Sequence, residues 1–253
     1  MSAPTSLLII PAAGLGTRLA YNGPKCLFEV AGKAMLGHVI ERHQTLVDEI
    51  AVVVSPRYKL DVSNWLKEQA LDGVKLFLQE SPTGMLDAIM CPAFAYKENG
   101  LGAVSISWCD QICISSVTAQ VLAEKLAQHN SVNMVFPTVE LRDPYIHMQR
   151  DANGAITKVL HQREGDIMPA VGENDCGLFG LTGTAYFGHL SAYANEIELG
   201  AGTGERNFLP FIPWLAQRGA KVETFAAQSA MEAVGVNTPQ DAAKIEQFWN
   251  NGE

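Results

Sequence analysis

The sequence lacks the cysteine pattern of a disulfide-stabilised or zinc-binding protein. It contains five cysteines and no Cys-x-x-Cys pair. Because an odd number without paired spacing fits neither a disulfide framework nor a structural zinc site, we expect free, buried thiols in a reducing compartment. They are Cys26, Cys91, Cys109, Cys113 and Cys176.

A long hydrophobic run and an excess of positive charge are also missing. The apolar segment 7–11 is too short for a signal-peptide core or a membrane span, and no basic residue precedes it. The 18 Lys and Arg residues are outnumbered by 27 Asp and Glu residues, which gives a net charge of −9. We therefore expect a cytoplasmic protein without a nucleic-acid or membrane partner, although a local phosphate pocket needs only a few cations and backbone amides.

The 253 residues are 47% hydrophobic, which is enough for a large core. Short apolar runs alternate with longer amphipathic stretches, and this pattern predicts an α/β fold with a mostly parallel sheet between helices. No Pro-, Gly- or Ser-rich linker divides the chain, so we expect a single domain over residues 1–253. Strands are expected at 7–10, 50–54, 74–78, 103–106, 131–137 and 155–160, and helices at 35–46, 59–70, 85–96, 117–129, 205–218 and 239–250.

The most specific motif is a glycine-rich loop after the first predicted strand. Small residues let backbone N–H groups approach a phosphate, and Arg18 and Lys25 add positive charge at two points. The loop is not a Walker A motif, because Thr17 follows Gly16, nor a dinucleotide fingerprint, because Leu19 stands at the third glycine position. A plain strand-to-helix turn is the alternative. The candidate phosphate-binding residues are Ala12, Ala13, Gly14, Gly16 and Thr17.

These residues, followed by Pro24-Lys25 and by Ala-Gly-Lys-Ala-Met at 31–35, resemble the N-terminal signature of the sugar-phosphate nucleotidyltransferases. The chain most resembles the uridylyltransferase module of N-acetylglucosamine-1-phosphate uridylyltransferase, and a weaker similarity covers nearly all of it. The resemblance implies a Rossmann-like three-layer α/β/α fold with a mostly parallel mixed sheet. It also implies a nucleotide-binding half at about 1–130 and an acceptor-binding half at about 131–253. Since the chain ends at Glu253, we expect no acetyltransferase half.

In such enzymes a phosphate oxygen of the acceptor attacks the α-phosphorus of a nucleoside triphosphate, and pyrophosphate leaves. Because two polyanions repel, the reaction depends on fixed cations and positioning. The resemblance assigns charge neutralisation to Arg18 and Lys25, and the binding of Mg²⁺ to Asp110 and Asn237. From the residues alone, a helix cap or a solvated side chain is the alternative for Asp110, and a helix cap for Asn237.

Three further residues match the nucleotide site of the family. Gln79 ends the third predicted strand, where the family's counterpart binds a pyrimidine base. A carboxamide both donates and accepts, so Gln79 does not specify one base, and a solvated strand-end glutamine is the alternative. Thr83 and Gly84 resemble the second nucleotide-binding turn, although their order differs from the usual one.

The acceptor pocket departs from the amino-sugar pattern. Asp175 stands where the relatives have Asn, and His161 stands where they have Glu. Glu205 is a candidate ligand for a hydroxyl or an amine, with a first-turn helix acid as the alternative. Because mismatched polar groups leave substrate hydroxyls unpaired, we expect an acceptor other than N-acetylglucosamine 1-phosphate.

The predicted function is the Mg²⁺-dependent transfer of a nucleoside monophosphate, from a pyrimidine nucleoside triphosphate, to a sugar 1-phosphate. One alternative is a cytidylyltransferase for a phospho-alcohol such as phosphocholine or a polyol phosphate. An aromatic cage would favour choline. Another alternative is a non-catalytic nucleotide sensor, and a homo-oligomer is compatible with the composition. The aromatic residues to inspect are Trp65, Trp108, Trp214 and Tyr145.

Overall fold

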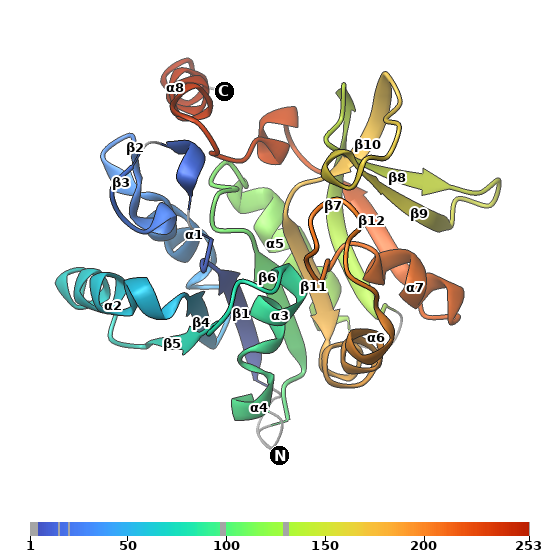
Figure 1. Ribbon diagram of the computed structural model, residues 1–253, viewed down its shortest axis with the longest axis horizontal. Helices are drawn as coiled ribbons and strands as arrows, with labels where there is room; N and C mark the ends of the chain where they lie inside the picture. Colours follow the sequence, from blue (N-terminus) through green and yellow to red (C-terminus); the bar gives the residue numbers. More distant parts are fainter. Residues whose placement is uncertain (1–4, 15, 20, 97–99, 129–131, 253) are drawn as a thin grey trace.

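The computed structural model describes residues 5–14, 16–19, 21–96, 100–128 and 132–252. Its first half contributes four strands to a central sheet: β1 (Ser6–Pro11), β4 (Glu49–Val54), β5 (Val74–Leu78) and β6 (Ala103–Ser107). They are parallel, in the spatial order β6-β1-β4-β5 (Figure 1). In β1, Leu7 and Ile9 pack into one core cluster and Leu8 and Ile10 into another. Successive side chains of a strand point to opposite faces, so this sheet is covered on both sides.

Helices provide the two outer layers. The helices of this half are α1 (Met35–His43), α2 (Lys59–Glu68), α3 (Met85–Met90), α4 (Ala93–Tyr96) and α5 (Ser116–Ala127). The buried side chains of α1 and α2 join the cluster of Leu8, and those of α3 join the cluster of Leu7. The single helix predicted over 85–96 is two helices, because Pro92 between them has no N–H for a helical hydrogen bond.

The second half completes the sheet with β7 (Met134–Arg142), β10 (Val171–Asp175), β11 (Leu178–Thr182) and β12 (Val222–Ala226). Strand β11 is antiparallel to β6 and to β7, and β12 is parallel to β7. The sheet therefore runs β10-β7-β11-β6-β1-β4-β5, with β12 on β7. The predicted three-layer α/β fold with a mixed sheet is confirmed.

Two hairpins lie outside the central sheet. They are β2 (Glu29–Val30) with β3 (Lys33–Ala34), and β8 (Ile146–Arg150) with β9 (Ile156–His161). The second half also contains a π-helix at Ala185–Leu190, α6 (Ser191–Glu196), α7 (Phe211–Gln217) and α8 (Pro239–Asn250). Short 3₁₀ helices lie at Thr17–Leu19, Lys25–Leu27, Pro56–Tyr58, Gln162–Glu164 and Ala230–Ala233.

Several predicted elements of the second half are wrong or incomplete. The helix expected at 205–218 begins only at Phe211, so Glu205 lies in a loop. The strand expected at 131–137 begins at Met134 and continues to Arg142, while residue 131 lies outside the described residues, as does His129 of the helix expected at 117–129. Strands β8, β10, β11 and β12 were not expected, because glycines and polar residues interrupt their apolar pattern.

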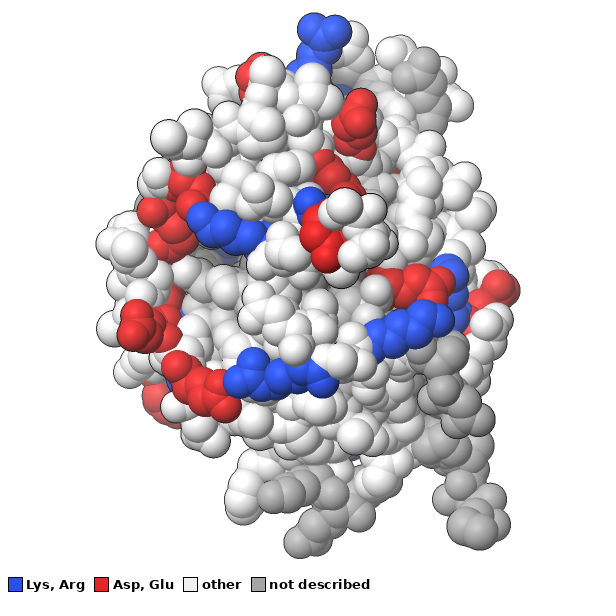
Figure 2. All heavy atoms as spheres, turned by 90° about the vertical axis from the view of Figure 1, so that its right-hand side faces the viewer, with Lys and Arg blue, Asp and Glu red and all other residues white. Residues whose placement is uncertain are grey.

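The surface carries both signs of charge side by side. Figure 2 shows Lys and Arg side chains next to Asp and Glu across one face, instead of a continuous basic patch. Ion pairs of this kind join Arg150 to Glu173 at 2.6 Å and Arg218 to Glu196 at 2.7 Å. All five cysteines are free, and four of them are buried, as expected. In the described part of the chain, no helix is both long and apolar enough to cross a membrane.

Candidate active site

Three segments far apart in sequence meet beyond the carboxyl ends of β1 and β6. Lys25 Nζ donates to Asp110 Oδ2 at 2.5 Å and to Asn237 Oδ1 at 2.9 Å. Arg18 Nη2 donates to the same Asn237 oxygen at 2.9 Å. The four residues that the resemblance assigns to charge neutralisation and metal binding therefore form one cluster, with two cationic and two oxygen-bearing side chains.

Glycine at position 16 lets Lys25 reach this cluster. Gly16 has a φ of +62°, and a Cβ placed on it would lie 2.6 Å from Lys25 Cβ, closer than real side chains approach. The loop then forms a short 3₁₀ turn at Thr17–Leu19, where Leu19 N donates to Gly16 O at 3.0 Å. Among the residues described between the loop and α1 there is no α-helix, so the loop does not lead directly from strand to helix as in a plain strand-to-helix turn.

Asn237 is held just before helix α8 without capping it. Thr238 is the N-cap, and its side chain accepts from Asp241 N at 3.2 Å. Asp241 Oδ2 in turn accepts from the backbone N–H of Asn237 at 3.0 Å. The alternative of a helix cap for Asn237 is therefore wrong, and its amide oxygen faces the two cations.

Asp110 follows β6 in a turn that is joined to the Asn237 segment. Its backbone oxygen accepts from Val236 N at 3.0 Å. The next helix, α5, is capped by Ser115, whose Oγ accepts from Thr118 N at 3.1 Å. Asp110 therefore caps no helix, and its carboxylate is bonded to Lys25 and largely buried, which also excludes a solvated side chain.

The donor set of the cluster fits a magnesium ion. Asp110 and Asn237 present a carboxylate and an amide oxygen within hydrogen-bond distance of one nitrogen, Lys25 Nζ. Mg²⁺ prefers such oxygens and usually keeps water or phosphate as its other ligands. Among the described residues, no group of three or more His, Cys, Asp or Glu side chains is placed to hold a metal ion. A site in which phosphate oxygens complete the coordination does not need three such side chains.

The residues expected to contact the nucleotide form a tight turn beside the loop. Gln79 is buried, and its Nε2 donates to Gly84 O at 2.8 Å, so a solvated strand-end glutamine is excluded. Gly84 has a φ of +125°, and a Cβ placed there would lie 2.5 Å from Arg206 N. Thr83 is exposed, and its carbonyl accepts from Arg206 N at 2.8 Å. This turn is therefore packed against the 206 segment.

The small residues of the loop lie beside this turn. Ala12 N donates to Val53 O at 2.7 Å and extends the pairing of β1 with β4. Ala13 is partly exposed and Gly14 is exposed, so their backbone groups are accessible to a ligand. Leu15 and the side chain of Thr17 lie outside the described part of the structure.

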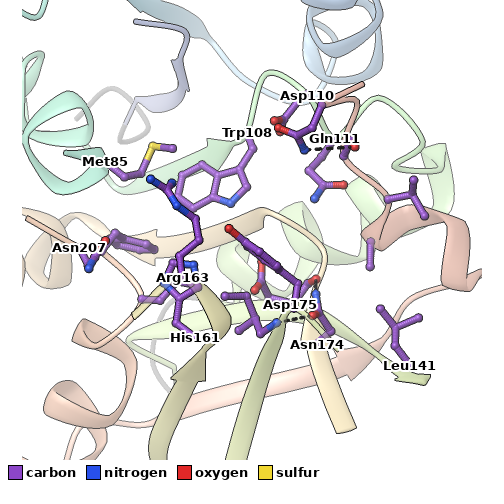
Figure 3. A pocket seen from close by; sticks show the side chains of 18 of the residues that line it. Met85, Trp108, Asp110, Gln111, Leu141, His161, Arg163, Asn174, Asp175 and Asn207 are labelled. Atoms are coloured by element: carbon purple, nitrogen blue, oxygen red, sulfur yellow. Dashed lines mark hydrogen bonds between the residues drawn. The ribbon is translucent and has the colours of Figure 1, made fainter. Parts of the chain in front are cut away.

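A cavity of about 490 Å³ opens next to the cluster (Figure 3). Its wall includes Met85, which also packs against the core cluster of Leu7. The cavity brings the three predicted acceptor residues to the same site as three members of the cluster. These lining residues are Arg18, Asp110, Asn237, His161, Asp175 and Glu205.

Asp175 is the most deeply buried of the acceptor candidates. It is 3% exposed, and its Oδ1 accepts from Gly177 N at 2.7 Å. Burial raises the pKa of Asp175 to about 6, while the backbone hydrogen bonds act in the opposite direction. A carboxyl group with such a pKa in a cleft is a functional-site candidate.

His161 and Glu205 are more accessible. Burial lowers the pKa of His161, so the imidazole is neutral at pH 7, and its ring lies 5.3 Å from that of Tyr145. Glu205 Oε1 lies 3.7 Å from Arg163 Nη2. Because Glu205 lies in a loop six residues before α7 begins at Phe211, the alternative of a first-turn helix acid is wrong.

The cavity wall also contains residues that the sequence did not single out. Arg163 lies in the 3₁₀ helix Gln162–Glu164 after β9, where no periodicity or motif marks it. Asn207 lies in the loop before α7, two residues after the candidate Glu205. Glu164, beside Arg163, accepts from Thr203, Gly202 and Asn207. These hydrogen bonds lower the pKa of Glu164 to about 2, although burial alone would raise that pKa. They also fix the loop.

Two of the four aromatic residues selected from the sequence line the cavity, namely Trp108 and Tyr145. The other two pack elsewhere. Trp65 lies against the helix residue Gly37, and Trp214 stacks on Phe211 at 5.8 Å. The wall of the cavity therefore contains two of the four aromatic residues selected from the sequence.

Comparison with known proteins agrees with the fold. The model of the MobA-like NTP transferase domain matches residues 8–173. The bifunctional protein GlmU of Thermobifida fusca is 26% identical over 98% of this chain, and that of Chromohalobacter salexigens is 29% identical over 96%. GlmU of Aquifex aeolicus is 29% identical over 94%.

The chain spans about half the length of the curated relatives it matches, namely 51%, 51% and 52% of the three GlmU proteins. The similarity therefore concerns one part of those bifunctional proteins. Since the family model covers well over half of this chain and the fold agrees with it, the chain belongs to the family of MobA-like NTP transferase domains.

Proposed function

We propose that this protein transfers a nucleoside monophosphate from a pyrimidine nucleoside triphosphate to a sugar 1-phosphate in a Mg²⁺-dependent reaction of sugar-nucleotide synthesis. The observation that carries the proposal is the convergence of Lys25, Arg18, Asp110 and Asn237 beside the cavity. Fixed cations and a metal site facing a roomy cavity are what a reaction between two polyanions needs.

The chain's own residues supply binding and charge neutralisation. Asp110 and Asn237 are the proposed metal ligands, and a bound Mg²⁺ would neutralise phosphate charge there. Lys25 and Arg18 stabilise the negative charge that develops on the transferring phosphoryl group. An oxygen of the acceptor phosphate forms a bond to the α-phosphorus while the bond from that phosphorus to the bridging oxygen breaks. The electron pair of the broken bond leaves with pyrophosphate.

Gln79 is the proposed contact to the base. Its Nε2 already donates to Gly84 O, which fixes the orientation of the carboxamide. The carbonyl oxygen and the second amide hydrogen remain for the polar edge of a pyrimidine. The loop residues 12–17 are proposed to bind the triphosphate with their backbone N–H groups.

The acceptor is proposed to occupy the far side of the cavity, near His161, Asp175 and Glu205. All three come from the second half of the chain, and the glycine-rich loop comes from the first. This distribution supports one domain with a nucleotide-binding half at about 1–130 and an acceptor-binding half at about 131–253.

A phospho-alcohol cytidylyltransferase is the second candidate. The presence of Trp108 and Tyr145 in the cavity wall favours it, because aromatic faces attract the cationic head of an amino alcohol. A nucleotide sensor without catalysis is less well supported, since binding alone would not require the complete set of Lys25, Asp110 and Asn237.

The test is pyrophosphate release with Mg²⁺, measured for ATP, GTP, CTP, UTP and dTTP against sugar 1-phosphates and phospho-alcohols. Release with a sugar 1-phosphate and UTP, CTP or dTTP supports the proposal. Release only with a phospho-alcohol supports the second candidate. Nucleotide binding without release for any acceptor supports the sensor.

A further inference from the structure

Asp175 is a buried carboxylate in the proposed acceptor site, and the transfer reaction alone does not say which group of the acceptor it binds. It is 3% exposed and lines the cavity. Its Oδ1 accepts from Gly177 N, and among the described residues no group donates to its second oxygen. No ion pair of the described chain includes it. A buried carboxylate normally has a cationic or hydrogen-bonding partner, so this one is available to a ligand.

Trp108 lies against the same turn as Asp175. Trp108 N donates to Gly177 O at 2.8 Å, and a Cβ on Gly177 would lie 2.5 Å from Trp108 Cδ1. The missing side chain of Gly177 therefore lets the indole pack directly on the turn that orients the carboxylate. Phe179 and Phe208 hold the indole from behind, with ring centroids at 5.1 and 5.9 Å. Figure 3 shows Trp108 and Asp175 facing the cavity from different sides.

The charges of the cavity differ between its two ends. Arg18 and Lys25 supply positive charge at the end where the phosphates are proposed to bind. At the other end Arg163 is near Glu205, at 3.7 Å, and the two charges offset each other. His161 beside them is neutral at pH 7, because burial lowers its pKa. Asp175 and Asp143, which also lines the cavity, are in no ion pair of the described residues, so the uncompensated charge at this end is negative.

We propose that the acceptor is a phosphate ester that also carries a cationic nitrogen, and that this nitrogen binds against the Asp175 carboxylate and the faces of Trp108 and Tyr145. The inference rests on the proposed nucleotidyl transfer and names the chemical class of its acceptor. Tyr145 is 43% exposed at the cavity wall and offers a second aromatic face. A cation both pairs with the buried charge and is attracted by aromatic rings, whereas a neutral hydroxyl satisfies only the hydrogen bond.

The nitrogen has two possible sources, a phosphorylated amino alcohol or an amino-sugar phosphate. Matched pairs of ligands distinguish them by calorimetric titration of the full chain with Mg²⁺ and the α,β-methylene analogues of UTP and CTP. One pair is phosphocholine and its neutral isostere 3,3-dimethylbutyl phosphate. The other is glucosamine 1-phosphate and glucose 1-phosphate. We expect the cationic member of at least one pair to bind about 10-fold more tightly or better.

The pair that shows the preference identifies the source of the nitrogen. Equal affinity within both pairs, or no binding of either cationic ligand, overturns the inference. Pyrophosphate release is measured separately, so release with only neutral acceptors would sustain the transfer and reject the cationic acceptor. A cationic preference in binding without any release would reject the transfer instead.

Two variants test the residues. Asp175→Asn keeps the shape and removes the charge, and we expect it to weaken binding of the preferred cationic ligand about 10-fold or more while changing that of its neutral partner less than about 3-fold. Should this core variant fail to fold, Tyr145→Leu at the more exposed position is expected to weaken binding of the cationic ligand about 3-fold or more. Equal losses for both members of a pair in the variant that folds would overturn the inference.

Discussion

At the scale of single residues, Lys25 connects the two proposed metal ligands. Its ammonium group donates to both Asp110 and Asn237, which places their oxygens close together before any ligand is bound. Such preorganisation is what electrostatic catalysis requires, because the groups need not be reoriented during the reaction. The loss of one member therefore affects the positions and the charges of the others.

Asp110→Ala is expected to lower turnover by on the order of 10²–10³ or more, because it removes a metal ligand and the partner of Lys25. Asp110→Asn keeps an oxygen but loses the charge, and a smaller loss is expected. The measurement is the steady-state rate of pyrophosphate release, with folding checked by circular dichroism. Asp72→Asn, at an exposed position before β5, is the matched control. A folded Asp110→Ala protein with near-normal turnover would contradict the assignment.

Asp175 is expected to lower the stability of the folded protein above pH 6. Its pKa is raised from 3.8 to about 6 by burial, so between these values the native state binds more protons than the unfolded state. The extra proton bound by the native state stabilises it at low pH, so the free energy of unfolding falls as pH rises from 3.8 to about 6. Asp175→Asn removes the effect, and relative to wild type it should gain about 2 kcal/mol between pH 4.5 and pH 7.

Urea denaturation of wild type and Asp175→Asn at the two pH values measures this gain, and Asp72→Asn serves as the control that should show none. Taking the difference between two proteins cancels the titration of their other groups. A constant difference between wild type and Asp175→Asn at pH 4.5 and pH 7 would mean that the carboxyl group has an ordinary pKa. It would also show that the group does not resist ionisation in the folded state.

Some site residues were predictable from the sequence and others were not. Lys25, Asp110 and Asn237 each stand in or beside a recognisable segment, and the structure brings them together. Arg163 lies in the 3₁₀ helix Gln162–Glu164, and Asn207 lies in a loop that long-range hydrogen bonds join to Glu164 of that helix. No local pattern encodes such contacts. The sequence therefore indicated the chemistry of the site but not the full wall of its cavity.

At the scale of elements, the sequence predicts the parallel strands of the sheet more accurately than the strands of the second half. Strands β1 and β4 are buried on both faces and contain the uninterrupted apolar runs 7–10 and 50–54. Strands β10 and β11 are instead separated by a bend at Gly177, with φ +66°, and contain polar or glycine residues such as Asn174 and Gly180. Their pairing is fixed by β6 and β7, which lie far away in sequence.

The turn before α3 is held by a close backbone contact that only glycine permits. We expect Gly84→Ala to lower the free energy of unfolding by at least about 2 kcal/mol. Its φ is +125°, and the added Cβ would lie 2.5 Å from Arg206 N and 2.6 Å from Arg206 O. Both atoms belong to a backbone that is hydrogen-bonded to the same turn, so neither can move freely.

Gly188→Ala is the control for this variant. Gly188 lies in the helical segment Ala185–Leu190, has open space around its Cβ position and is not in the site. Because alanine favours helix more than glycine does, the change should be neutral or stabilising by up to about 1 kcal/mol. Chemical denaturation of the two variants compares them directly. Equal effects would show that the contact with Arg206 does not constrain the turn.

At the scale of the whole molecule, the two proposed halves share one sheet and one core. Strand β11 of the second half pairs with β6 of the first over five residues, Leu178 to Thr182. The core cluster that contains Leu7 of β1 also contains Leu215 of α7. Separating the halves would expose this shared apolar surface and leave a sheet edge unpaired, both of which cost free energy.

We therefore expect the protein to unfold in a single transition, although the proposed substrate contacts divide between its halves. The measurement follows urea denaturation by far-ultraviolet circular dichroism and by tryptophan emission in Trp65→Phe and Trp214→Phe, which remove a reporter from the first and the second half. Both variants should give coincident midpoints for the two signals, because the shared sheet couples the halves. Midpoints that differ between signals or between reporters would reveal two independently stable units, and the cavity would then lie between domains able to move apart.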